Sequence, residues 1–298
     1  MKKILVSGLI NTETTVRIRK FPIEYYPIDY PFFGVNTRAS GVAYNIVKAL
    51  KNLGDEVTLV SMTGNDFGAE YVKNEVQKAG VSTEFIKNVL RETPNSVVLY
   101  DGYGNRQIYC DLKDVQETQY CFDESLYSDC DVVIACNTNF NRELLQRARE
   151  AGKTVATDVH VLSDINDEYN LDFMRYSNIL FLSDENIHSD YRWFVSSIEE
   201  KFHNDIIVLG MGSKGALMYV KNDGQFYELP AYNVREVVNT VGAGDALFSA
   251  FIHFYAKGYS PVECLKRAQI FAAYKIGFDG ASVGFANEET IEQLVKCF

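Results

Sequence analysis

The chain has 298 residues, of which 47% are hydrophobic and 23% are charged, so it can bury a globular core without disulfides, and disorder is not expected. Its formal net charge is −11 and no basic cluster interrupts it, which argues against partners such as nucleic acid or an anionic membrane. The first apolar run is too short for a signal peptide and no stretch approaches a membrane span, so a cytoplasmic location is expected.

Strand-like apolar runs alternate with helix-like periodic stretches through most of the chain. The expected strands are residues 4–10, 56–64, 131–136, 153–159, 178–183 and 205–210, and the expected helices are residues 42–54, 68–81 and 141–152. This alternation predicts an α/β fold with a mainly parallel central sheet covered by helices. No repeat or polar linker marks a boundary, so residues 1–298 are expected to form one domain.

Two stretches break this rhythm. Residues 14–36 carry three prolines and many aromatic side chains, and they alternate in places. Residues 96–111 are typical of a hairpin that turns at residues 102–105. Together they predict a small β-structure that stands off the main sheet, and the alternative is an edge extension of that sheet.

Residues 206–215, IIVLGMGSKG, contain the pattern G-x-G-x-x-G directly after an expected strand. A dinucleotide-binding interpretation requires a helix next, whose amino terminus would hold a pyrophosphate. The following residues, ALMYVKNDGQFYELP, favour a hairpin with an N-D-G turn instead. The glycines then serve tight turns, which is compatible with a nucleotide lying against the loop.

The most informative stretch is VVNTVGAGDALFSAFIHFY, residues 237–255. The apolar side chains after Ala246 are dense enough for a buried helix, which places residues 242–244 in its first turn. Unpaired N–H groups and the positive end of the helix dipole face outward there, and glycines let a phosphate approach closely. Asp245 has two interpretations: an N-terminal capping carboxylate, or a base that accepts a proton from an attacking hydroxyl.

The order of short motifs along the chain resembles the ribokinase-like (PfkB) family of sugar and nucleoside kinases. These motifs are G-L-I-N-T-E at residues 8–13, S-G-V-A-Y-N at 40–45, T-G-N-D-F-G at 63–68, G-M-G-S-K-G at 210–215 and N-T-V-G-A-G-D at 239–245. The G-A-G-D element followed by an apolar helix is the specific one. The resemblance implies a three-layer α/β/α fold with a small β-lid, formed by the inserts at about 14–36 and 96–111.

The resemblance also implies the reaction and its residues. The family transfers the γ-phosphate of ATP, with Mg²⁺, to a hydroxymethyl group of a small sugar or nucleoside, and its lid often mediates a homodimer. The implied roles are as follows: Asp245 is the catalytic base; Gly242, Ala243 and Gly244 form the anion hole; Asn11, Glu13, Gly41 and Asn45 bind the substrate; Gly212, Gly215 and Thr240 lie on the nucleotide side.

The sequence departs from the family at several positions. Glu13 stands where an aspartate is usual, which alters the reach of the carboxylate by about one methylene. Asn239 replaces another aspartate, which argues against a bound monovalent cation near that turn. The family's N-x-x-E element appears as residues 184–187 and ends in Ile187, so its final acid is absent. Asp184 and Glu185 are the remaining candidates for binding Mg²⁺. The alternative is that both are solvated acids of a loop.

Two other functions remain open at this point. One is a nucleoside kinase of the same fold, in which Tyr100, Tyr103 or Tyr109 stacks on a base. The other is a sugar-binding regulator that keeps the fold but has lost turnover. The departures from the family at Asn239 and Ile187 favour this alternative. A homodimer through the lid is also expected, because Ile18, Phe21, Ile23, Phe32 and Phe33 would otherwise expose apolar surface.

Overall fold

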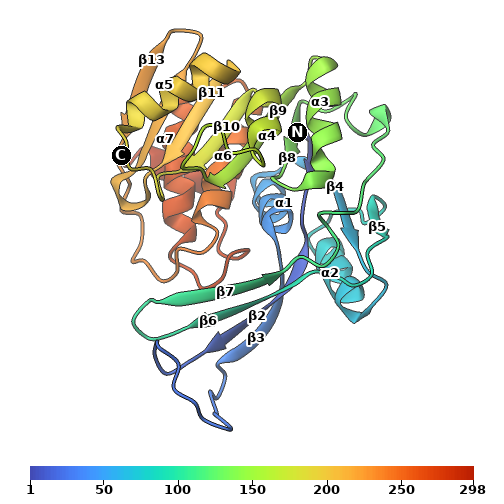
Figure 1. Ribbon diagram of the computed structural model, residues 1–298. Helices are drawn as coiled ribbons and strands as arrows, with labels where there is room; N and C mark the ends of the chain where they lie inside the picture. Colours follow the sequence, from blue (N-terminus) through green and yellow to red (C-terminus); the bar gives the residue numbers. More distant parts are fainter.

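The computed structural model describes residues 1–298 and contains a nine-stranded central sheet (Figure 1). Its strands are β1 (Lys3–Ser7), β4 (Glu56–Thr63), β5 (Ile86–Asn88), β8 (Val132–Ala135), β9 (Thr154–Val161), β10 (Ile179–Ser183), β11 (Ile206–Gly210), β12 (Ala216–Val220) and β13 (Gln225–Leu229). They lie in the order β13-β12-β11-β10-β9-β8-β1-β4-β5. The strands from β5 to β11 are parallel, and β12 and β13 add an antiparallel edge, so the expected mainly parallel sheet is confirmed.

Helices cover both faces of this sheet and complete a three-layer α/β/α architecture (Figure 1). One face carries α1 (Val42–Leu53), α2 (Phe67–Lys78), α6 (Ala243–Ala256), α7 (Pro261–Lys275) and α8 (Glu288–Val295), and the other carries α3 (Arg142–Glu150), α4 (Leu171–Tyr176) and α5 (Tyr191–Phe202). None of these helices combines the length and the apolar character needed to cross a membrane.

The sheet separates two hydrophobic cores because successive side chains of a strand point to opposite faces. In β1, Ile4 and Val6 belong to the core beneath α1 and α6, whereas Leu5 belongs to the core beneath α3 and α5. All three are at most 1% exposed. Strands buried on both faces read as continuous apolar runs, which is why the alternation of such runs with helices was readable in the sequence.

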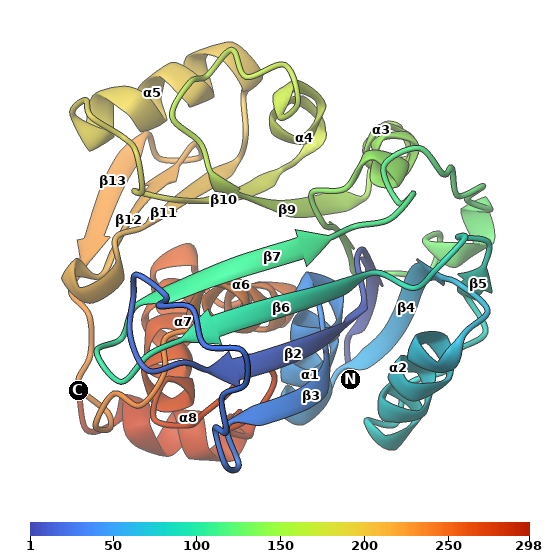
Figure 2. The same cartoon turned by 60° about the horizontal axis from the view of Figure 1, so that its bottom comes forward.

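A separate four-stranded sheet forms the lid, in the order β3-β2-β6-β7 (Figure 2). Its strands are β2 (Asn11–Arg17), β3 (Val35–Ser40), β6 (Asn95–Tyr100) and β7 (Arg106–Asp111). The hairpin from β6 to β7 turns at the expected residues, where the carboxylate of Asp101 accepts from the amides of Tyr103 and Asn105.

The first lid insert differs from the expected range. The strands β2 and β3 lie at the ends of residues 11–40, and residues 18–34 between them contain no strand. The three prolines of that segment, at positions 22, 27 and 31, have no backbone N–H to donate to a ladder. The expected strand over residues 4–10 also ends early, at Ser7.

The chain makes a hairpin after β11, as the sequence predicts, so the dinucleotide-binding interpretation is wrong. A short 3₁₀ turn, Gly212–Lys214, is followed by β12, which pairs with β11 in antiparallel fashion. Gly215 ends this 3₁₀ turn with a φ of 105°, and a Cβ atom added to it would lie 2.0 Å from the carbonyl oxygen of Leu229. This glycine is therefore required by the backbone itself.

Replacing Gly215 by alanine tests that requirement. The strained φ and the clash with the backbone of residue 229 should destabilise the protein by about 3 kcal/mol or more. Gly224→Ala is the matched control, because Gly224 also has a positive φ, 65°, but no atom lies within 4 Å of a Cβ atom added to it. Thermal unfolding followed by circular dichroism compares the two, and equal melting temperatures for both variants would contradict the role assigned to Gly215.

Candidate active site

The first turn of α6 presents unpaired backbone amides. Gly242 caps the helix with φ of 77°, and the amide of Ala243 donates to the carbonyl of Thr240 at 3.1 Å. The amides of Gly242, Gly244 and Asp245 donate to no group of the protein. Of the three residues predicted to form an anion hole, Ala243 therefore has its amide already engaged, and the amide of Asp245 is free in addition. Free amides at a helix amino terminus bind anions.

The two glycines with free amides differ in what the surrounding protein requires of them. A Cβ atom on Gly242 would lie 2.6 Å from the carbonyl oxygen of Ala281, and the positive φ disfavours other residues as well. Gly244 is exposed, and no atom lies within 4 Å of a Cβ added to it. The turn itself thus requires glycine at position 242, whereas the surrounding protein sets no steric demand for glycine at position 244.

Asp245 is the third residue of α6 and does not cap it, so the capping interpretation is wrong. Its Oδ2 accepts a hydrogen bond of 2.7 Å from Nδ2 of Asn45 in α1. Burial raises the pKa of the Asp245 carboxyl, while the bond from Asn45 and the nearby His160 partly lower it. A carboxyl with a raised pKa is a better proton acceptor than an ordinary aspartate.

Asn45 is positioned by the start of α1. Gly41 caps this helix with φ of 103°, and a Cβ atom there would lie 2.5 Å from the carbonyl oxygen of Leu9. The amide of Asn45 donates to the carbonyl of Gly41 at 3.0 Å. The side-chain Oδ1 of Asn45 is buried and has no partner, so it can accept a hydrogen bond from a ligand.

The lid contributes Asn11 and Glu13, which lie on the same face of β2 because they are two residues apart. Asn11 donates from Nδ2 to Oγ of Ser96, and its buried Oδ1 has no partner. Glu13 accepts from Oγ of Ser40 at 3.2 Å. Burial raises the pKa of Glu13, and the Ser40 bond and the charge of Arg38 oppose this effect.

These side chains form one connected arrangement. Ser40 pairs with Asn11 across the lid and binds Glu13, and it is followed directly by Gly41, which begins the helix of Asn45. Asn45 in turn binds Asp245. The structure therefore links the predicted substrate residues to the first turn of α6 through contacts and adjacent backbone.

The predicted nucleotide-side residues lie near the carboxyl end of β11 and before α6. Gly212 has φ of 56° and open space around its Cβ position, whereas Gly215 is packed against the next turn. Thr240 is exposed and its carbonyl accepts from Ala243. Asn239, which departs from the family, accepts from the amide of Val241 and donates to Asp279.

Asp184 and Glu185 follow the carboxyl end of β10. Asp184 accepts from the hydroxyl of Tyr191 at 3.0 Å, and its Oδ2 lies 3.9 Å from Nζ of Lys214. Glu185 is exposed. Carboxylates suit Mg²⁺, which usually keeps several waters, so the donor chemistry fits, although Asp184 already has a cationic neighbour. Ile187, where the family has an acid, is only 8% exposed and packs in the core.

Sequence reasoning missed Asp158 and His160, which lie at the carboxyl end of β9. Both act electrostatically on Asp245: His160 lowers its pKa and Asp158 raises it. His160 has φ of 59°, and its amide donates to Asp158 at 2.8 Å. Ligands of open α/β sheets bind outside the carboxyl ends of strands, so the polar residues at and directly after the end of the expected strand 153–159 were the available signal.

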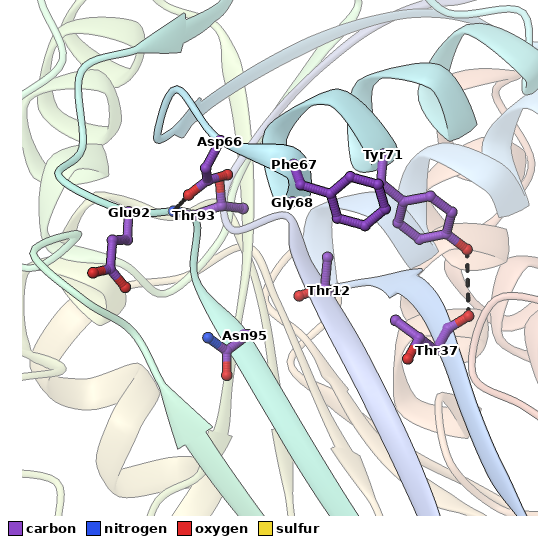
Figure 3. Close-up of a pocket in the computed structure, with 9 residues that line it drawn as sticks. All are labelled: Thr12, Thr37, Asp66, Phe67, Gly68, Tyr71, Glu92, Thr93 and Asn95. Atoms are coloured by element: carbon purple, nitrogen blue, oxygen red, sulfur yellow. Dashed lines mark hydrogen bonds between the residues drawn. The ribbon is translucent and has the colours of Figure 1, made fainter.

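A pocket of about 380 Å³ lies on the other face of the lid (Figure 3). Thr12 lines it and points away from the face of its neighbours Asn11 and Glu13. Phe67 and Tyr71 of α2 stack along one side, and the hydroxyl of Tyr71 donates to the carbonyl of Thr37. None of the residues assigned to catalysis lines this pocket, so it is distinct from the site at α6.

The chain is similar over nearly its whole length to known kinases. A family model described as pfkB family carbohydrate kinase matches residues 1–287. A nucleoside kinase of Methanocaldococcus jannaschii is 22% identical over 305 residues, covering 99% of this chain and 98% of that protein. A deoxyribokinase of Salmonella typhi is 23% identical over 316 residues, covering 98% of each. The structure of Arabidopsis thaliana ribokinase complexed with ribose and ATP superimposes with a TM-score of 0.83 at 19% identity, covering 99% of both chains, which shows the same fold.

The raised pKa of Asp245 has a consequence for stability. Between the unfolded pKa and the raised folded pKa, the folded state binds more protons, so stability falls as pH rises through this window and stays lower above it. Asp245→Asn removes the buried charge but can still accept the bond from Asn45. We expect a higher melting temperature for the variant at pH 7, by a few degrees at most, since ~1 kcal/mol corresponds to roughly 2–4 °C in a large domain.

Melting curves from pH 3 to pH 8 measure this difference. It should shrink as the wild-type carboxyl becomes protonated at low pH. A variant that is less stable than wild type at pH 7 would show that the ionised carboxylate stabilises the fold, contrary to the burial argument.

Proposed function

Because the chain belongs to the PfkB family of carbohydrate kinases and is an ATP-dependent phosphotransferase, we propose that it phosphorylates a hydroxymethyl group of a small sugar or sugar derivative. The observation that carries this proposal is the first turn of α6, where three free amides adjoin the carboxylate of Asp245. Residues 1–298 act in this proposal as one kinase domain whose lid is the four-stranded sheet.

The reaction proceeds by attack of the acceptor hydroxyl on the γ-phosphorus of ATP. The new O–P bond forms, the bond from phosphorus to the ADP oxygen breaks, and the hydroxyl proton passes to Asp245. The amides of Gly242 and Gly244 donate to the phosphoryl oxygens as negative charge spreads over them. Mg²⁺, when bound with ATP, neutralises the phosphates. Phosphoryl transfer is largely loose, so positioning and electrostatics contribute more than the base.

The substrate residues position the acceptor. The buried, unpartnered Oδ1 atoms of Asn11 and Asn45 accept bonds from sugar hydroxyls, and Glu13 accepts another. Gly41 allows the close backbone approach at the start of α1. On the nucleotide side, Gly212 and Thr240 border the phosphates of ATP. Gly215 maintains the turn after β11 that positions Gly212. The relatives named nucleoside kinase, deoxyribokinase and ribokinase support an acceptor in the range from free sugars to nucleosides.

A nucleoside kinase is the second candidate, and one observation favours it. Tyr100 of β6 lies on the same face of the lid as Ser96, the partner of Asn11, because the two are separated by an even number of residues. A base could stack on it there. Tyr109 pairs with Val97 and therefore lies on the other face, and Tyr103 lies in the exposed turn. Of the three tyrosines, Tyr100 is the one whose position on its strand supports this role.

ADP release measured with Mg²⁺-ATP and a panel of sugars, sugar acids, sugar phosphates and nucleosides tests the function. We expect release that depends on one class of acceptor and falls on the order of 10²-fold or more in Asp245→Asn, the usual effect of removing a general base. The melting curve of the same variant shows that it is folded.

The panel also separates the alternatives. A nucleoside that exceeds its free sugar as acceptor identifies a nucleoside kinase. Saturable sugar binding without any ATP consumption, in wild type and variant alike, identifies a non-catalytic regulator and overturns the proposal. A near-wild-type rate in Asp245→Asn removes Asp245 from the mechanism.

We also propose a homodimer through the lid. In the segment between β2 and β3, Ile23, Phe32 and Phe33 are 53%, 81% and 101% exposed, while Ile18 and Phe21 are half-buried. Exposed apolar clusters of this kind mark interaction surfaces. Light scattering should give twice the chain mass at micromolar concentration, and Phe32→Asp together with Phe33→Asp should return it to the monomer mass. A wild-type monomer contradicts the proposal.

A further inference from the structure

Lys275, the last residue of α7, is the one buried lysine of the chain and is 0% exposed. Its Nζ donates to the carbonyl oxygen of Val241, directly before the turn that presents the free amides. No carboxylate oxygen lies within salt-bridge distance of it. A buried ammonium without an ion pair is costly for folding, so its position beneath this turn calls for an explanation that packing does not give.

The contact with Val241 determines how the next amide points. The carbonyl of Val241 and the N–H of Gly242 belong to the same peptide unit, and in a planar trans peptide these two groups point in opposite directions. Because the carbonyl is held inward by Lys275, the N–H of Gly242 points away from it. That N–H is one of the three amides without a protein partner.

The charges around Lys275 keep it in its ammonium form. Burial lowers the pKa of Lys275 to about 8, and Asp245 of α6 and Asp279, which follows α7, act in the opposite direction. The ammonium form therefore prevails at pH 7. Asp279 is itself bonded to Asn239 and lies 4.0 Å from Arg38 of the lid. A buried positive charge thus lies directly behind the turn that presents the free amides.

We propose that Lys275 is a positioning residue that acts as a built-in cation: its ammonium orients the 241–242 peptide so that the Gly242 amide faces the transferred phosphoryl group, and it offsets the negative charge that gathers there. This inference rests on the proposed function. Since the chain supplies the cation itself, turnover needs no added monovalent cation, in line with the departure at Asn239.

Lys275→Met, which keeps the unbranched shape and most of the length of the side chain and removes its charge, is the first test. We expect kcat to fall roughly 10²-fold, as for the misplacement of a single stabilising donor, with little change in the KM of the acceptor. Lys266→Met is the matched control, because Lys266 lies on the same helix and is partly exposed. Wild-type kcat in a folded Lys275→Met variant overturns the inference.

Chemical rescue separates a lost cation from a damaged fold. Lys275→Ala leaves a cavity beneath Val241, and ammonium or potassium ions should restore part of the lost kcat, whereas the larger tetramethylammonium ion should not. Restoration by all three salts to the same extent, or by none while the variant is folded, contradicts a role for local positive charge.

The wild-type protein gives a test that depends on no variant. Turnover in tetramethylammonium chloride should equal turnover in potassium chloride at the same ionic strength, and strong activation by potassium overturns the inference. Asp245→Asn, assayed alongside, distinguishes the two proposals. If this variant is inactive, the kinase mechanism holds whatever the result for Lys275. If it is fully active, the role of Asp245 in the mechanism is wrong, and the inference about Lys275 is judged by its own tests.

Discussion

The proposed site depends on the first turn of α6, where a helix amino terminus presents free amides and holds a carboxylate at the same place. Three free amides and Asp245 meet there. The helix dipole favours the ionised carboxylate, whereas burial disfavours it and raises its pKa. The position of the turn is fixed from behind, since Phe248, Phe251 and Phe254 of α6 are at most 1% exposed. Core packing therefore sets the geometry of this turn.

The lid is joined to this turn through very few residues. Ser40 ends β3 and binds Glu13, and the next residue, Gly41, already caps α1, whose Asn45 holds Asp245. A second connection runs from Arg38 of β3, which donates to the carbonyl of Asp279. A movement of the lid strands is consequently transmitted to Asp245, through Asn45, and to Asp279, which binds Asn239 just before the α6 turn. In the proposed mechanism, such coupling would let a bound acceptor align Asp245 at the same time as the lid excludes water.

The sequence predicted the features that local pattern determines. Buried parallel strands read as apolar runs, and the glycines before an apolar helix marked the α6 turn. It could not show that Thr240 engages the amide of Ala243, nor that β9 brings His160 close to Asp245, because those relations are tertiary. The burial of Lys275 could not be predicted from the sequence either, because a lysine at a helix end usually faces solvent. The start of α7 also carries a local sequence signal, because Ser260 and Glu263 form a capping box and Pro261 occupies the first turn.

The same residues explain why the site should discriminate among acceptors. Asn11 and Asn45 each bury an oxygen without a partner, and Asp245 and Lys275 bury charge near the turn. Each of these lowers the stability of the empty protein. A ligand with hydroxyl groups in the right places completes the open hydrogen bonds, whereas an analogue that lacks one of them leaves a buried oxygen unpaired. Sites of this kind reject such analogues far more strongly than an apolar pocket rejects a missing methylene. If these residues bind the acceptor as proposed, the instability of the empty site is the physical origin of its selectivity.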